Sequence, residues 1–394
     1  MPETMIISYK YRLLPTKSQH ACLREILESQ RILYNAALEE RIGCYKKTGK
    51  GRSYMDQCKG LTEWRKEESE VPVNMQRWTL KRLDDAYSAF FKRLKKGSGK
   101  AGFPRFRGKG WWKSFGFAEF SGIGLKEGKL RFKGLAGALR IHMHRPLPVD
   151  ADIRSCGITK DLKGWSVSLQ IKIPCADTKE VITSIGVDVG LMAFATMSDG
   201  SSIPNPRIAR KAQKRLRLLQ RKFSRCKRNS KNRNKARAAV ARAHLKIANT
   251  RDTFLHQASA GMVNRFDAIA VEKLQVKNMG HGTMAKSIHD ASWSKWFGQL
   301  RYKAERAGTQ VAAVDPRYTS QTCSGCGVIV KKQLQDRVHD CKDCGLVLDR
   351  DHNAAINILE RGKEQFVGVV AHREANVEQW FKRSPRNAIL ELAA

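Results

Sequence analysis

Two apolar runs decide how this chain folds: Ile185-Gly-Val-Asp-Val-Gly190 and Ala268-Ile-Ala-Val-Glu272. Strands that are apolar on both faces are typical of the interior of a parallel sheet, where helices cover both sides. Each run carries a carboxylate at or near its end, Asp188 or Glu272, and ligand sites form at the carboxyl edge of such sheets. A buried carboxylate has to be paired or bound to a metal ion. We therefore predict an α/β unit with acidic groups at one sheet edge.

A third acidic candidate is Asp351, at the start of a predicted helix in Asp349-Arg-Asp-His-Asn-Ala-Ala-Ile-Asn-Ile358. Alone, Asp188 could lie in a turn, Glu272 could pair with a neighbouring cation and Asp351 could only cap its helix. Together the three match an RNase H-like nuclease, in which carboxylates hold two Mg²⁺ ions, with Mn²⁺ as an alternative. Asp349 is the rival for the third place.

Four cysteines form two closely spaced pairs, Cys323 with Cys326 and Cys341 with Cys344. A glycine follows each pair and permits the tight turn that brings both thiolates onto one ion. A disulfide pair or an iron–sulfur site is an alternative, but the spacing favours tetrahedral Zn²⁺ in a ribbon. Four protein ligands leave no position for water, so this zinc would be structural.

The charge of the chain requires an anionic partner. Its 394 residues carry 74 Lys and Arg against 37 Asp and Glu, a formal net charge of +37. The apolar fraction of 41% is that of a folded protein. No run is long and apolar enough to span a membrane and no export leader is evident, so we expect a cytoplasmic, nucleoid-associated protein. The other six cysteines are scattered, which indicates reduced thiols.

The cations gather in two regions. Residues 201–251 contain 18 Lys or Arg and no acidic residue, and we expect a basic helical hairpin there with Arg215, Arg221 and Arg225 among its nucleic-acid contacts. An ordinary solvated hairpin is the alternative. Between residues 97 and 120, Arg105, Arg107 and other cations alternate with aromatic residues that can stack on bases.

The chain as a whole is predicted to be multidomain, with an α+β part followed by an α/β part. Long helices are expected from residue 16 and over residues 75–96, and period-two alternation over residues 130–173 indicates a small β-barrel or sheet. The expected domains are a barrel (1–15 and 121–175), a helical domain (16–120), a nuclease (180–315 and 345–362), a zinc ribbon (316–346) and a tail (363–394).

Several motifs resemble the TnpB family, transposon-encoded relatives of the type V CRISPR effectors. The C-terminal half carries the resemblance in Gly186-Val-Asp-Val-Gly190, Val271-Glu-Lys-Leu274, Tyr318-Thr-Ser-Gln-Thr-Cys-Ser-Gly-Cys-Gly327 and the run 349–358. The N-terminal half resembles the family in Tyr34-Asn35 with Leu38-Glu39, Thr48-Gly-Lys-Gly51 and Gly102-Phe-Pro-Arg-Phe-Arg107.

The resemblance implies an RNA-guided DNA endonuclease in which a transposon-derived guide RNA pairs with double-stranded DNA beside a short adjacent motif. It implies a RuvC-type nuclease with Asp188, Glu272 and Asp351 as its catalytic trio. The sequence does not determine the oligomeric state, and we expect one protein per guide RNA. The barrel would be a wedge (WED-like) domain and the helices a recognition (REC-like) domain, with motif contacts from Tyr54, Gln76 and Arg77. Alternatives are a nuclease-inactive RNA-guided regulator, a transposase with the same acidic site, or a CRISPR effector.

Overall fold

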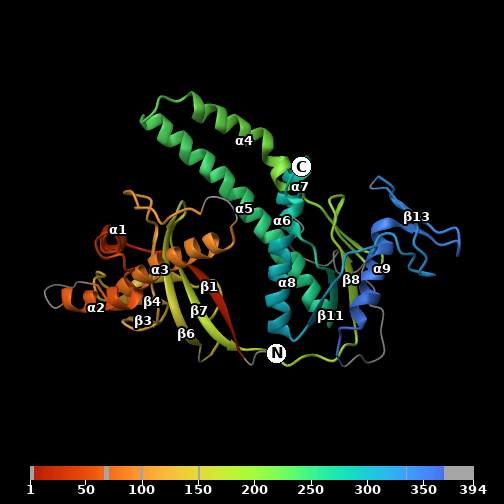
Figure 1. The fold of residues 1–394 in the computed structure, drawn as a ribbon, viewed down its shortest axis with the longest axis horizontal. Coiled ribbons are helices and arrows are strands. Elements are labelled where there is room, and N and C mark those ends of the chain that lie inside the picture. The colour runs from red at the N-terminus through yellow and green to blue at the C-terminus, as the bar shows by residue number, and fades with distance from the viewer. Residues whose placement is uncertain (1–3, 66–70, 98–100, 150, 334, 368–394) are drawn as a thin grey trace. The chain divides into compact units, whose positions relative to one another are not determined.

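The computed structural model describes residues 4–65, 71–97, 101–149, 151–333 and 335–367 (Figure 1). The chain divides into two units, Pro2–Pro174 and Cys175–Ala394 with Met1. Of the predicted tail, residues 368–394 lie outside the described part of the chain. Within the described ranges, no helix combines the length and the apolar character that crossing a membrane requires.

The N-terminal unit is built on a seven-stranded antiparallel sheet in the order β2-β6-β7-β1-β5-β4-β3. Its strands are β1 (Thr4–Leu14), β2 (Ser114–Phe117), β3 (Ile123–Lys126), β4 (Lys129–Phe132), β5 (Leu139–His142), β6 (Asp152–Asp161) and β7 (Gly164–Pro174). Phe132 of β4 packs against Phe115 and Phe117 of β2, with ring centroids 6.3 and 5.5 Å apart. Because these strands lie far apart in the sheet order, the sheet is curled and barrel-like.

Three helices accompany this sheet: α1 (Lys17–Thr48), α2 (Tyr54–Trp64) and α3 (Val73–Lys95). A capping box between Thr16 and Gln19 starts α1, and Gly49 ends it with φ 70°. The two long helices are as expected, but α2 was not predicted. Strand β2 belongs to the sheet although the expected helical domain extended to residue 120.

The aromatic residues of the segment 103–117 divide into two groups. Trp112, Phe115 and Phe117 are buried in the core, whereas Phe103, Phe106 and Trp111 are exposed. The buried group serves the core of the N-terminal unit, because Phe115 and Phe117 of β2 both pack inside it. Base stacking is restricted to the exposed group.

The C-terminal unit contains a five-stranded sheet in the order β10-β9-β8-β11-β12, of which β8, β11 and β12 are parallel. Its strands are β8 (Ser184–Asp188), β9 (Ala193–Met197), β10 (Ser202–Pro204), β11 (Ala268–Glu272) and β12 (Gln310–Val314). A separate two-stranded hairpin consists of β13 (Val338–Asp340) and β14 (Val347–Asp349). Residues 185, 187, 269 and 271 of the central strands are buried, as apolar runs predict.

The helices of this unit are α4 (Ile208–Arg225), α5 (Lys231–Arg265), α6 (Val276–Met279), α7 (Ala285–Ala291), α8 (Trp293–Ala307) and α9 (Arg350–Lys363). The predicted basic hairpin is α4 with α5, and Figure 1 shows it projecting from the rest of its unit. Within α4 no residue is buried, whereas Leu255 and Met262 near the end of α5 join the core. The cations of α4 and of the first part of α5 therefore lie on the surface of this unit.

Candidate active site and metal centre

Asp188 and Glu272 lie at the carboxyl ends of neighbouring parallel strands. Val187 of β8 pairs with Val271 of β11, so this register brings the two following carboxylates to the same level at one sheet edge. Both side chains remain partly exposed, unlike the valines before them. This is the edge at which the two apolar runs predicted an acidic site.

Helix α9 brings the third carboxylate to this sheet because two glycines remove the side chains between them. A Cβ at Gly186 of β8 would lie 2.1 Å from the carbonyl oxygen of Ala355 in α9. A Cβ at Gly362 of α9 would lie 2.4 Å from Cβ of Ala270 in β11. Helix and sheet therefore approach to backbone contact, which fixes the position of α9.

Asp351 occupies the first turn of α9. The Asp349 carboxylate accepts hydrogen bonds from the backbone N–H groups of Asp351 and His352, at 2.9 and 3.1 Å, and so acts as the N-cap. The Asp351 carboxylate instead accepts from the Arg350 guanidinium at 3.1 and 3.2 Å. A Cβ added to Gly190, two residues past Asp188, would lie 3.7 Å from the Asp351 carboxylate. This geometry favours Asp351 over Asp349 as the third member of the trio.

The pKa of Asp188 depends on the charges of the other two carboxylates. Burial raises the pKa of Asp188 well above its usual value, and the negative charges of Glu272 and Asp351 raise it further. The Arg350 charge and the Val189 N–H act in the opposite direction. The repulsion between the carboxylates favours a bound cation, because a cation would remove it.

Glu272 is held by a residue that follows β12. Burial raises the pKa of Glu272, while a hydrogen bond from Thr319 and the charge of Arg361 lower it. The Thr319 hydroxyl donates to Oε1 of Glu272 at 2.6 Å. Hard carboxylate oxygens are the donors that Mg²⁺ prefers, so the residues present fit this ion. Among the described residues, only the four paired cysteines bring three or more ligand atoms within 4.8 Å of one another, so the oxygens of the three carboxylates do not all lie that close together.

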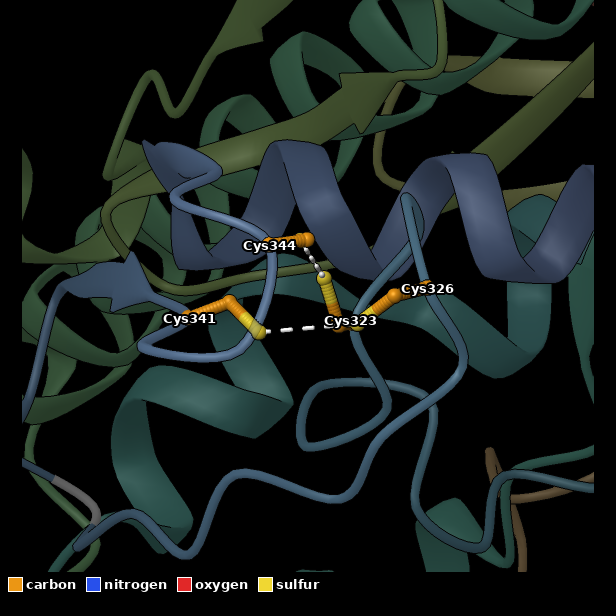
Figure 2. A group of neighbouring side chains, drawn as sticks. All are labelled: Cys323, Cys326, Cys341 and Cys344. Atoms are coloured by element: carbon orange, nitrogen blue, oxygen red, sulfur yellow. Dashed lines mark hydrogen bonds between the residues drawn. The ribbon is translucent and has the colours of Figure 1, made fainter.

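The four paired cysteines form one cluster, the candidate metal centre (Figure 2). Sγ of Cys323 lies 3.5 Å from that of Cys344, and Sγ of Cys326 lies 3.6 Å from that of Cys341. Disulfide sulfurs are ~2.05 Å apart. Four sulfurs at ~2.3 Å from a tetrahedral zinc ion are about 3.8 Å from one another. The distances therefore fit zinc and exclude a disulfide in this arrangement.

The thiol pKa values show the same need for a cation. Burial raises the pKa of Cys323, but the backbone N–H groups of Cys326 and Gly325, together with hydrogen bonds from His339 and Cys344, outweigh it and bring the pKa to about 6. The Val328 N–H lowers the pKa of Cys326, but burial and the other three thiols bring it to about 12. Four adjacent thiols cannot all ionise without a cation, and Zn²⁺ would allow it.

Two asparagines join the metal centre to α9. Asn353 accepts from Ser324 N–H at 3.0 Å and donates to the Thr322 carbonyl at 2.8 Å. One turn later, Asn357 donates to the Thr319 and Thr322 carbonyls at 2.8 and 2.7 Å. Both side chains are buried. The loop that leads into Cys323 is thus fastened to the helix that carries Asp351.

The other candidate residues are distributed over both units. Arg77, Arg105 and Arg107 of the N-terminal unit are exposed, as are Arg215, Arg221 and Arg225 of α4. Gln76 is buried and accepts a hydrogen bond from Arg65, which does not favour it as a contact with DNA. Tyr54 is partly buried, and burial raises its pKa to about 12.

Sequence reasoning did not identify Thr319, Arg350, Arg361, Asn353 or Asn357 as parts of the site. Four of them lie inside the motifs quoted for the resemblance, and that was the available signal. No sequence pattern indicated Arg361, because only the packing of α9 brings its charge near Glu272.

Comparisons with known proteins match most of the chain. Family models match residues 1–50 ("Helix-turn-helix domain"), 167–281 ("Probable transposase") and 293–358 ("Cas12f1-like, TNB domain"). A protein of Streptomyces pristinaespiralis, named as an RNA-guided DNA endonuclease, is 34% identical over 90% of this chain and 89% of its own length.

InsQ of Escherichia coli (strain K12), also named as an RNA-guided DNA endonuclease, is 30% identical over 90% of this chain and 92% of its own. The Cas12f1–sgRNA–target DNA complex contains a chain of similar fold, with a TM-score of 0.57 at 16% identity. That match covers 87% of this chain and 83% of the other.

Proposed function

Because the chain belongs to the TnpB family of RNA-guided DNA endonucleases, we propose that it cleaves double-stranded DNA under the direction of a guide RNA. The guide would come from a transposon end, and the DNA would be bound beside a short adjacent motif. The observation that carries the proposal is the meeting of β8, β11 and α9 at one sheet edge, each with a carboxylate.

In this proposal, Asp188, Glu272 and Asp351 hold two Mg²⁺ ions in a RuvC-type site. When bound, the ions supply a nucleophile at neutral pH and stabilise charge on the phosphodiester during in-line attack. Asp188 would contribute a carboxylate ligand from the sheet, and Asp351 would contribute one from α9. Thr319 orients Glu272 by donating to its Oε1, and Arg350 orients Asp351. One site of this kind would cut both strands in turn.

The zinc ion is proposed to be structural, because four thiolates complete its coordination. Its role would be to hold the loop that Asn353 and Asn357 fasten to α9. The curled sheet of β1 to β7 is proposed as the wedge domain, and the helices α1 to α3 are proposed as the recognition domain. Residues 180–315 and 345–362 form the proposed nuclease, and 316–346 form the zinc ribbon.

The basic hairpin α4–α5 is proposed to line the channel of the RNA–DNA hybrid. Its exposed cations support this, since phosphate neutralisation releases counterions and provides affinity without sequence preference. Tyr54 and Arg77 remain the proposed contacts with the adjacent motif. The proposed location is the cytoplasm of a prokaryotic cell, in association with the nucleoid, where the target is found.

The test is cleavage of plasmid DNA by protein purified with its RNA, with and without Mg²⁺. The bound RNA is sequenced first, and its guide segment is placed in plasmids with randomised flanks. Asp188→Ala should lower the rate by about 10³-fold or more, because a metal ligand supplies several kcal/mol of charge stabilisation. Asp315→Ala is the matched control, because this exposed carboxylate follows β12 at the same sheet edge. Undiminished cutting by Asp188→Ala would contradict the assignment.

A transposase that joins DNA strands is the alternative favoured by one matching family description. It would use the same carboxylates, but its products would be joined strands and it would need no RNA. Cleavage that survives complete removal of RNA, together with joined products, would establish that alternative.

A further inference from the structure

A short segment of the N-terminal unit is fixed at one end by a side-chain clamp. We name residues 102–107 the strap. Asn35 of α1 accepts a hydrogen bond from the Arg107 backbone N–H at 2.8 Å and donates to the Arg107 carbonyl at 3.1 Å. Arg31 donates to the same carbonyl at 2.9 Å. Three hydrogen bonds thus hold the backbone of one residue that belongs to no helix or strand.

The other end of the strap is fixed to α3. Arg93 donates to the Gly102 carbonyl at 3.0 Å. The Phe103 ring packs edge-on against Tyr87 and Phe90, with centroids 5.5 and 5.2 Å apart. With both ends fixed, most of the conformational entropy of the strap is already lost before any ligand binds.

Between these ends, the strap directs charged and aromatic groups to solvent. Arg105, Phe106 and Arg107 are all exposed, and Phe106 is 56% exposed. Residues 86–118 contain nine Lys or Arg and no acidic residue. An exposed aromatic ring between cations, on a segment whose backbone is fixed at both ends, has the chemistry that binds an unpaired base and its phosphates.

Arg107 also lies near a second arginine. Its guanidinium lies 5.7 Å from the centroid of the Tyr34 ring, and the Arg82 guanidinium lies 4.3 Å from that of Trp112. The Tyr34 and Trp112 centroids are only 5.0 Å apart. Across the described ranges, no salt bridge reaches either arginine. Burial lowers the pKa of Arg82, and the charge of Arg107 lowers it further, so the pair repels and an anion would relieve it.

We propose that Arg107 binds one phosphate of a nucleic-acid strand while Phe106 stacks on an adjacent unpaired base, and that the nearby charge of Arg82 adds to the attraction. The proposal rests on the proposed function and deepens it by assigning a subsite. Asn35 is a positioning residue that places Arg107. The shared chemistry, a phosphate beside an unstacked base, can come from the guide RNA or from a DNA strand.

The test measures binding of the full-length protein in an Asp188→Ala background, freed of RNA, to a labelled strand of about 20 nucleotides over a salt series. The strand is supplied as RNA and as DNA. Phe106→Leu should weaken binding about tenfold, the loss of one base stack, without changing the salt dependence. Phe106→Tyr should bind as the parent does. Arg107→Ala should reduce the slope of log K against log salt by about 0.7, the loss of one single-strand phosphate contact.

Arg154→Ala is the matched control for charge, because Arg154 is exposed and already paired with Asp152 at 3.4 Å. It should leave the slope unchanged. Asn35→Ala should weaken binding although Arg107 is retained. A loss confined to the RNA probe assigns the subsite to RNA, and one confined to DNA assigns it to DNA. Parental binding of both probes by Phe106→Leu and Arg107→Ala, with intact thermal unfolding, would overturn the proposal. Because no cleavage is measured, failure of the nuclease assignment would be seen separately.

Discussion

Replacing Gly186 with alanine should separate α9 from the strand that carries Asp188. The new Cβ would lie 2.1 Å from the Ala355 carbonyl oxygen and 2.7 Å from the Leu359 nitrogen, whereas ordinary contact is 3.4–4 Å. Both are backbone atoms, so no rotamer change relieves the overlap. Helix α9 therefore has to move by about 1 Å, and misplacement of this size costs about 10²-fold in rate. Asp351 moves with the helix.

The assay compares single-turnover DNA cleavage, guide RNA binding and thermal unfolding of Gly186→Ala with those of the parent. Overpacking should also cost about 1–3 kcal/mol of unfolding free energy. RNA binding should be unchanged, because the substitution lies under the nuclease site. Gly298→Ala in α8 is the matched control, since nothing lies within 4 Å of a Cβ there. A cleavage rate within about twofold of the parent would refute this reasoning.

A second pair of substitutions tests the same contact with a rescue. Gly362→Ala places a Cβ 2.4 Å from Cβ of Ala270, so it should displace α9 in the same way. Adding Ala270→Gly removes the atom that is struck and should restore most of the cleavage. Failure of the double variant to recover, with Ala270→Gly alone active, would show that the helix–sheet distance is not what matters.

Three further outcomes are expected. The pKa of Asp188 is raised in the folded state, so ionisation of this group destabilises the metal-free fold as pH rises through that pKa. Asp188→Asn should therefore raise the Tm by about 3 °C at neutral pH. The variant should also lose the further rise in Tm that Mg²⁺ gives the parent. A lower Tm in scanning fluorimetry would contradict this. Thr319→Val removes the hydrogen bond that lowers the pKa of Glu272, so the acid limb of the pH–rate profile should move to higher pH, and an unmoved limb would count against it. Cys341→Ser should lose the zinc found by mass spectrometry in the parent and lower cleavage through the ties of Asn353 to the ribbon, and full activity without zinc would argue otherwise.

Much of the C-terminal unit was predictable because its signals are local. The apolar runs around Asp188 and Glu272 form β8 and β11, and Asp351 lies in the first turn of α9. The cysteine spacing also predicted the cluster, whose sulfurs do meet. In each case a short stretch carries both the element and the functional side chain.

The remaining features depend on which surfaces pack together. Helix α2 was missed although Ser53 and Asp56 form a capping box at its start, because it is short and its apolar stripe is brief. Gln76 is buried by α3 packing, which its sequence neighbours do not indicate. Likewise, the sequence does not show why position 186 requires a glycine, because the reason is the close packing of Ala355 against it.

The position of α9 near the end of the chain has a consequence for the order in which the site is synthesised. Both strands with carboxylates, β8 and β11, leave the ribosome before α9, which follows every other element described here. The curled sheet of the N-terminal unit closes with β7 and can form much earlier. A nascent chain therefore completes its curled sheet and both strands with carboxylates before the helix that carries Asp351 is synthesised.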